Sequence, residues 1–166
     1  MSNSNLVTID MSDFARVAYR IEAYAKNILP KKVKGLIDRM VRTGEQYAVN
    51  TVGHIDTGAT LASVMGYRNG DKGVIVADGA AVWIEFGTGV VANAGNAPHP
   101  KAGELGMSAW GTYGQGKGAN LNGWWYEGDD GEYHHTMGIP ANRFMYNTAQ
   151  MLIKECPEWA KEIFKP

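Results

Sequence analysis

The first third of the chain carries apolar side chains at helical spacing. Between residues 12 and 30 they recur every three or four positions, which places them on one stripe of a helix. The stripe comprises Phe14, Val17, Ala18, Ile21, Tyr24, Ala25 and Ile28. Asp10 or Ser12 can cap the start of this helix, and Pro30 opposes its continuation. We therefore expect a first amphipathic helix that ends near Pro30.

A second apolar stripe begins after Pro30 and predicts another helix, with lysines and arginines largely outside the stripe. Its members are Val33, Leu36, Ile37, Met40, Val41, Gly44, Tyr47, Ala48 and Thr51. Gly35 and Gly44 weaken the prediction, because each costs ~1 kcal/mol relative to alanine inside a helix. The region 10–52 is expected to be helical, as two helices with a proline between them.

After residue 52 the apolar runs become shorter and turn residues separate them. Asp56, Thr57 and Gly58 predict a turn, because the first two side chains can bond nearby backbone and glycine accepts a positive φ. The runs 61–68 and 73–78 predict two strands.

Asn69-Gly70-Asp71 separates these two runs and predicts a hairpin turn. The next run, 80–87, is also apolar, and its pattern leaves open whether it forms a strand or a short helix.

The segment that follows is rich in glycine. Residues 92–131 contain ten glycines in forty positions, which predicts a long irregular excursion over 92–123. Its last part has the form of a hairpin, in which Trp124-Trp125-Tyr126 leads into a turn at Asp129-Asp130-Gly131. The return strand is expected at 132–135.

A third helical stripe closes the chain over 140–164, with Pro140 at its start and Pro157 ending or kinking it. The stripe comprises Ala141, Phe144, Met145, Thr148, Leu152 and Cys156. With no repeat or linker, we expect one domain over 1–166 with a sheet region at 55–139. The predicted class is α+β: an antiparallel sheet with two N-terminal helices and a C-terminal helix packed on it.

Composition and charge narrow the function classes. The chain has 166 residues, 45% hydrophobic and 20% charged, which is ordinary globular usage. A net charge of -1 argues against a general binder of nucleic acid or membrane surfaces. Residues 1–50 carry eight Lys and Arg against five Asp and Glu, and the remainder carries eight against twelve. The two parts could attract one another between copies, although such charges are usually only a solvated surface.

The single cysteine, Cys156, permits no internal disulfide and fits a reducing compartment. The first ten residues show no secretory signal pattern, and no apolar run reaches the ~20 residues that a membrane helix needs. We expect a protein made in a cytoplasm, with no membrane partner.

Gly87-Thr88-Gly89-Val90-Val91-Ala92 spells the Gly-x-Gly-x-x-Ala pattern of a dinucleotide-binding turn. That turn works because a helix follows and offers its N-terminal N–H groups to the pyrophosphate. The residues after Gly89 include two glycines, two prolines and two asparagines, which oppose such a helix. We expect no cofactor at this position.

Metal binding is not indicated either. His54, His99, His134 and His135 lack the spacing of a metal site. Neighbouring His134 and His135 on a strand would point to opposite faces. Cys156 is expected to be a small buried hydrophobe on its helix.

Glu85 is the strongest candidate for acid catalysis, because it lies in an apolar run beside Trp83 and Phe86. Asp129, Asp130 or Glu132 could be its partner next to the Trp124-Trp125-Tyr126 cluster, in the layout of a sugar-cleaving site.

The simpler interpretation is that Glu85 points outward or pairs with a basic side chain such as Arg143. The three aromatic residues 124–126 equally fit core packing or a protein–protein contact. No basic stripe interleaves them, so single-stranded nucleic acid fits poorly.

Three strings, in order, resemble the gene-product-ten-like minor structural proteins of tailed phages and prophages, a family also described as tail-completion or head–tail joining proteins. The resemblance spans about residues 55–150. Its signature is an Asp-Thr-Gly-Ala turn, then Glu-Phe-Gly-Thr-Gly after an apolar run, then a Pro-x-Arg-Phe entry into the last helix. The matching residues are Asp56, Thr57, Gly58, Ala59, Glu85, Phe86, Gly87, Thr88, Gly89, Pro140, Arg143 and Phe144. This sequence departs from the signature by its Pro-Ala-Asn-Arg-Phe entry and by a longer glycine-rich excursion.

The resemblance implies a small α+β subunit, without catalysis or cofactor, that forms a ring in the virion neck or at the head-proximal end of the tail. Its implied partners are further copies and other neck or tail proteins, with no sequence-specific nucleic acid, and it implies assembly in the bacterial host cytoplasm. It also assigns structural roles to the motifs: a buried or interfacial Glu85–Arg143 ion pair that fixes geometry, a sharp exit of the chain at Gly87-Thr88-Gly89, and possible interface contacts at Trp124, Trp125 and Tyr126. The alternative is a carbohydrate-binding or glycoside-cleaving module that uses Glu85 and the 124–126 cluster.

Overall fold

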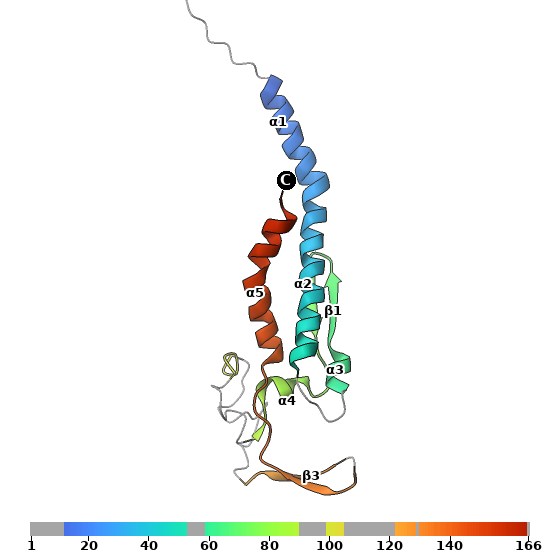
Figure 1. The fold of residues 1–166 in the computed structure, drawn as a ribbon, viewed down its shortest axis with the longest axis vertical. Helices are drawn as coiled ribbons and strands as arrows, with labels where there is room; N and C mark the ends of the chain where they lie inside the picture. Colours follow the sequence, from blue (N-terminus) through green and yellow to red (C-terminus); the bar gives the residue numbers. More distant parts are fainter. Residues whose placement is uncertain (1–11, 53–58, 90–98, 105–121, 129, 166) are drawn as a thin grey trace, which may run out of the picture.

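The computed structural model describes residues 12–52, 59–89, 99–104, 122–128 and 130–165. These residues form an elongated molecule of long helices and two small antiparallel hairpins, and the predicted α+β class is confirmed (Figure 1). Two predictions concern residues outside the described part of the chain. They are the turn at Asp56, Thr57 and Gly58 and the irregular course at 92–98 and 105–121.

The N-terminal region is one continuous helical rod. Helix α1 (Ser12–Ala23) passes through the π-turn η1 (Tyr24–Ile28) into α2 (Leu29–Thr51). The expectation that Pro30 separates two helices was wrong. Proline lacks an N–H and its ring crowds the carbonyl four residues earlier, and the wider turn of a π-helix immediately before it accommodates both demands.

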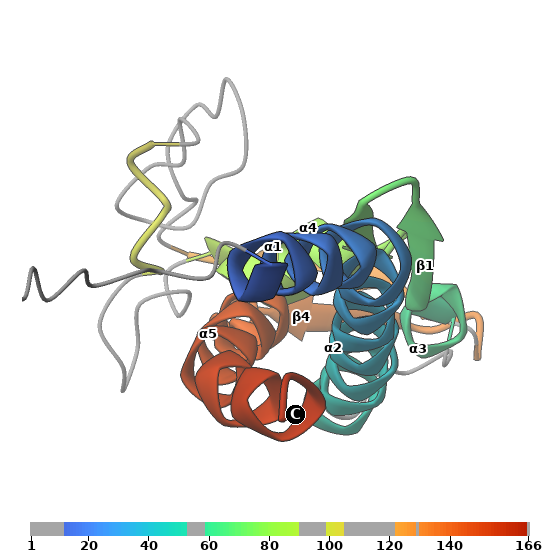
Figure 2. The same ribbon diagram turned by 90° about the horizontal axis from the view of Figure 1, so that it is seen from above.

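Helix α5 (Phe144–Ile163) runs antiparallel to α2, and the two lie side by side in both views (Figures 1 and 2). It therefore packs mainly on a helix, whereas the sequence predicted packing on the sheet. The helix begins at Phe144, four residues after the predicted start at Pro140. Pro157 lies inside the helix, which continues to Ile163, so this proline does not end it. Gly44 of α2 lies at this contact, where a Cβ would meet the ends of the Ile75 and Leu152 side chains and would require them to shift.

The first hairpin follows a short helix. Helix α3 (Ala59–Ser63) occupies the beginning of the run predicted as a strand, and β1 (Met65–Asn69) pairs with β2 (Lys72–Val76). Asn69 lies opposite Lys72, and Gly70 has a φ of 61°, as the predicted hairpin turn requires. The hairpin packs against α2.

The run left open between strand and helix is a helix, α4 (Ala81–Phe86). Its buried residues Ala81 and Ile84 join the core where the end of α2 meets the start of α5. This core comprises Ala48, Val52, Val64, Ala81, Ile84 and Phe144. Phe144 is fully buried, so the first residue of α5 is fixed by packing.

The second hairpin consists of β3 (Trp124–Glu127) and β4 (Tyr133–Thr136), as predicted from the aromatic cluster and its turn. It lies at the end of the molecule opposite α1 (Figure 1). It forms a separate two-stranded sheet, so the single sheet of the prediction is two hairpins.

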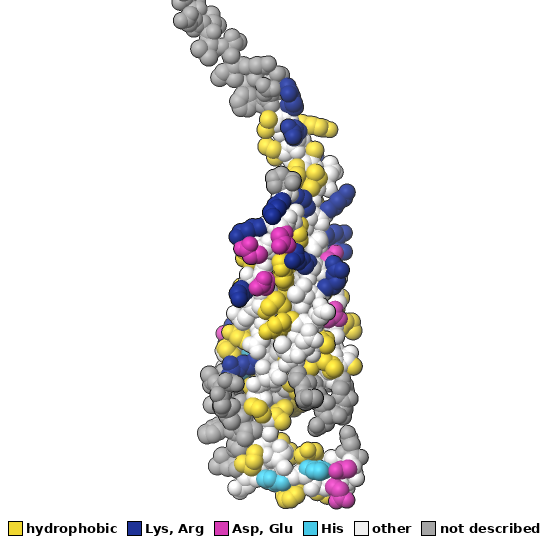
Figure 3. Space-filling model, in the orientation of Figure 1, with side chains coloured by type: hydrophobic (Ala, Val, Ile, Leu, Met, Phe, Trp, Pro, Cys, Tyr) yellow, Lys and Arg dark blue, Asp and Glu magenta, His cyan; other side chains and the backbone are white. Residues whose placement is uncertain are grey.

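Among the described residues, no helix is both long enough and sufficiently apolar to cross a membrane. Basic side chains gather on the upper half of the visible face, while histidine, acidic and apolar side chains share the lower tip (Figure 3).

Candidate functional site at the start of helix α5

The first turn of α5 has no cap of its own. Its N-cap residue is Arg143, whose side chain makes no capping hydrogen bond. The free N–H groups of a helix start need acceptors, and Ser, Thr, Asp or Asn usually supply them from the N-cap position. The acceptor for α5 must therefore come from elsewhere in the chain.

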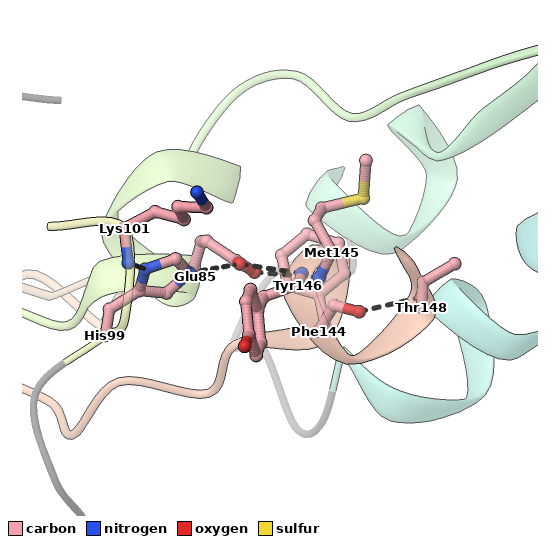
Figure 4. Close-up of polar contacts among 7 residues, drawn as sticks. All are labelled: Glu85, His99, Lys101, Phe144, Met145, Tyr146 and Thr148. Carbon is pink, nitrogen blue, oxygen red and sulfur yellow. Dashed lines mark hydrogen bonds and ion pairs between the residues drawn. The ribbon is translucent and has the colours of Figure 1, made fainter. Parts of the chain in front are cut away.

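Glu85, at the end of α4, is that acceptor. The backbone N–H of Met145 donates to its Oε2 at 2.8 Å, and that of Tyr146 donates to its Oε1 at 2.9 Å (Figure 4). Glu85 is 6% exposed, so these bonds form away from water. A carboxylate at this place also meets the positive end of the helix dipole. Glu85 thus caps a helix that begins about sixty residues later.

His99 fixes the carboxylate from the other side. Its Nε2 donates to Glu85 Oε1 at 2.8 Å, while its Nδ1 accepts the backbone N–H of Lys101 at 3.0 Å (Figure 4). Because Nδ1 is an acceptor, the imidazole proton lies on Nε2. The His99 ring packs 4.2 Å from Phe86 and 5.4 Å from Tyr146, measured between ring centroids.

The backbone on both sides of Glu85 pairs with the chain that leads into α5. The N–H groups of Asn142 and Arg143 donate to the carbonyls of Ile84 and Glu85, at 2.9 and 3.1 Å. Further along, Thr88 donates its N–H to the carbonyl of Ile139 at 2.8 Å. The N–H of Ile139 in turn donates to the Thr88 hydroxyl at 3.1 Å.

Glycines allow the backbone just after α4 to lie against residues 137–139, a close approach called here the crossing. Gly87 ends α4 with a φ of 72°, which accounts for the sharp exit expected of the Gly-Thr-Gly string. Gly89 and Gly138 lie where the two segments touch, with φ values of 64° and 103°. A Cβ on Gly89 would overlap the carbonyl of Met137, and one on Gly138 would overlap that of Thr88.

The predicted ion pair between Glu85 and Arg143 is not formed. The carboxylate bonds to His99 and to backbone N–H groups, and the buried Arg143 Nε and Nη2 atoms have no hydrogen-bond partner among the described residues. Arg143 reaches Glu85 only through the backbone bond described above, and its φ of 62° turns the chain into α5. The local geometry that the ion pair was expected to fix is instead fixed by the hydrogen bonds between the Glu85 carboxylate and the first turn of α5.

The site contains a surface hollow of about 310 Å³ lined by Glu85, Phe86, His99, Lys101, Met145 and Tyr146, among others. Three of its acid–base groups, Glu85, His99 and Lys101, already have hydrogen-bond partners. Both Glu85 oxygens accept N–H bonds, and both His99 nitrogens have partners. Lys101 bonds both oxygens of Glu104 at 2.8 Å, and this hydrogen bond raises the pKa of the lysine above 10.5. The arrangement suits a rigid joint better than proton transfer.

Helix α4 leads into Gly87, whereas a strand leads into a dinucleotide-binding turn. Among the residues that the structure describes, no three His, Cys, Asp or Glu side chains are grouped to hold a metal ion.

His134 and His135 lie on opposite faces of β4, as expected. The first bonds Asp130 at 2.9 Å, and the second packs 5.1 Å from the Trp125 ring. Cys156 is only partly buried, contrary to the buried position expected of it.

The other residues singled out from the sequence occupy two places. Most of the motif residues lie where the end of α4 meets the start of α5, a place called here the joint: Glu85, Phe86, Gly87, Thr88, Gly89, Arg143 and Phe144. Pro140 lies in the segment just before α5. Trp124, Trp125 and Tyr126 lie in β3 and are 37%, 66% and 44% exposed. Asp56, Thr57 and Gly58 fall outside the described part of the chain.

Sequence reasoning missed His99, Gly138 and Ile139. An arginine where α5 needs a capping side chain was the available signal that an acceptor comes from a distant residue. Comparisons of the chain with protein-family models, with curated proteins and with solved structures found no match.

Proposed function

We propose that the chain is a virion structural protein of a tailed phage or prophage, placed in the neck or at the end of the tail, which completes the tail or joins it to the head by assembling into an oligomeric ring. Its partners are further copies of itself and other neck or tail proteins. It acts without catalysis, cofactor or sequence-specific nucleic acid binding, inside the virion assembled in the host cytoplasm.

The observation that carries the proposal is the environment of Glu85. This residue belongs to one of the three strings of the resemblance, and its carboxylate is buried and bonded to the start of α5. The same string supplies the glycines and the threonine that pair with residues 137–139. Such a motif builds a joint between segments, which is what a structural subunit requires.

The distribution of apolar side chains supports self-assembly. Within the described residues, nineteen large hydrophobic side chains are exposed, against eight hydrophobic residues that are buried. Monomeric proteins rarely expose contiguous apolar patches beyond a few hundred Å². Nine of the exposed side chains lie on α1, η1 and the β3–β4 hairpin, where contacts with other protein surfaces would bury them.

Glycoside cleavage is less well supported. A catalytic acid or nucleophile must reach the substrate, and the Glu85 side chain is 8% exposed with three N–H donors on its two oxygens. The exposed aromatics of β3 remain compatible with glycan binding, which the following experiment includes.

Size-exclusion chromatography with light scattering tests the proposal, on the full chain alone and mixed with the proteins encoded beside it. We expect species larger than a monomer that grow with concentration or on addition of a neck or tail protein. A chain that stays monomeric in every mixture and binds glycans on an array would contradict it.

A further inference from the structure

One side of the α1–η1 rod is an apolar ridge that is exposed within the described part of the chain. The ridge consists of Val17, Ile21, Tyr24 and Ile28, which recur at four-, three- and four-residue steps and so share one face. Their exposed fractions run from 37% to 64%. Helix α5 ends near the level of Lys32, whose ammonium bonds the Lys165 carbonyl at 2.6 Å, so α1 extends beyond the body of the molecule (Figure 1).

The β3–β4 hairpin exposes a second apolar surface. Register pairs place Trp125, Glu127, Tyr133 and His135 on one face of the hairpin, called here the aromatic face. Trp125 is 66% and Tyr133 69% exposed. The opposite face is partly occupied, since the Trp124 ring lies against Gly89. Among the described residues, the aromatic face is therefore the more exposed side of the hairpin.

The two surfaces carry opposite charge. Residues 12–34 contain six Lys and Arg against two Asp and Glu, while residues 122–138 contain four acidic residues and no Lys or Arg. Within the described part of the chain, Arg20, Lys31 and Lys34 form no ion pair, nor do Glu127 and Glu132. The basic and acidic tips are visible at opposite ends of the molecule (Figure 3).

We infer that the ridge of one copy docks on the aromatic face of the hairpin of the next copy. This contact rests on the proposed self-assembly and is its interface. A hairpin at the far end of the molecule cannot reach its own α1, so the contact is between copies (Figure 1). The two surfaces differ, so the interface is heterologous and each copy binds two neighbours. Repetition of one such contact generates a ring if the rotation closes.

Charge selects this arrangement over pairing of two ridges. Two copies joined through α1 would bring their basic segments together, with Arg20 at the border of each ridge. The aromatic face instead offers Glu127 beside Trp125 and Tyr133, so apolar burial and charge attraction act together. Aromatic residues bury about 150–250 Å² each, so Trp125 and Tyr133 on one side and Tyr24 on the other supply part of the ~800 Å² per partner of a standard interface, together with the aliphatic ridge side chains.

Photo-crosslinking of the full chain tests the contact even when association is weak. We would place p-benzoylphenylalanine at position 24, in place of the ridge residue Tyr24, and at position 153, in place of Ile153, which lies on α5 and is 67% exposed. We expect crosslinks from position 24 to the 124–136 peptide of a second copy, and none to that peptide from position 153. Crosslinks from position 24 to other peptides, or no intermolecular product, would overturn the inference.

A mixing experiment tests the heterologous character. Ile21→Ser removes a ridge side chain and Trp125→Ser removes the centre of the aromatic face, both at exposed positions where folding can be verified by circular dichroism. Each change should weaken self-association at least about tenfold, as loss of an interface anchor does. An equimolar mixture retains one intact ridge and one intact hairpin, so it should form dimers and nothing larger.

If either variant alone assembled like the unchanged protein, the inference would fail while the proposed function stood. If the unchanged chain formed no complex with itself or with neck and tail proteins, the proposed function would fail as well. The two failures are therefore distinguishable.

Discussion

Glu85 performs for α5 the task that an N-cap side chain usually performs within its own helix. Two backbone N–H groups and one imidazole N–H converge on a single buried carboxylate, so the residue connects α4, α5 and the 99–104 segment. Any substitution that removes one carboxylate oxygen leaves a buried donor without an acceptor. The cost of that loss is large compared with the cost of breaking an exposed ion pair.

Glu85→Gln is expected to reduce the free energy of unfolding by about 1–3 kcal/mol, because a buried N–H loses its acceptor and an amide N–H₂ takes its place. Urea unfolding followed by circular dichroism measures the difference. Two control variants should each change it by less than about 1 kcal/mol: Glu104→Gln, whose ion pair is exposed, and Arg143→Met, whose buried Nε and Nη2 have no hydrogen-bond partner in the described part of the chain. A loss in Arg143→Met as large as that in Glu85→Gln would contradict this account.

The hairpin turn predicts a pH effect at Asp130. The hydrogen bond from His134 is the largest cause that holds the pKa of this carboxyl below its usual 3.8. A lowered folded-state pKa means that the contribution to hairpin stability is present above the unfolded-state pKa and is lost as the pH falls through the folded-state pKa. An NMR titration of the Asp130 carboxyl should show the pKa rising toward 3.8 in His134→Ala. An unchanged pKa in that variant would refute the role given to the histidine.

At the scale of elements, the sequence predicted whatever depends on local pattern. The helical stripes, the Asn69-Gly70-Asp71 turn and the aromatic hairpin follow from residues within a few positions of one another. The capping of α5 and the crossing of Gly89 with Gly138 depend on residues about fifty or sixty positions apart, which periodicity cannot pair. The prediction that Pro30 separates two helices was wrong because the π-turn before the proline lets the helical rod continue through it.

The crossing predicts unequal costs for two glycine substitutions. Gly138→Ala places a methyl group on the Thr88 carbonyl in addition to a left-handed backbone, whereas Gly131 has a φ of 77° and nothing within 4 Å of its Cβ position. Gly131→Ala should cost about 1–2 kcal/mol from the backbone alone. Gly138→Ala should cost more than about 3 kcal/mol. Thermal unfolding of both variants measures this, and equal losses would mean that the crossing can relax.

The π-turn predicts a local gain on replacement of the proline. Pro30→Ala restores a donor and removes the crowding of the preceding turn, so the opening free energy of residues 24–30 should rise by about 1–3 kcal/mol. Hydrogen exchange resolved by NMR measures these amides, with those of α5 as an internal reference that should not change. Reduced protection at 24–30 would show that the proline stabilises the turn.

The whole molecule is a rod with a rigid joint near one end and apolar surfaces at both ends. The joint uses the motif residues and engages Glu85 and His99 in hydrogen bonds, while the segments that carry the ridge and the aromatic face have opposite net charge. Negative-stain imaging of the concentrated protein, alone and with neighbouring neck or tail proteins, tests the central claim most directly. We predict closed rings of uniform diameter in at least one of these samples. Isolated single subunits in all of them would contradict the account.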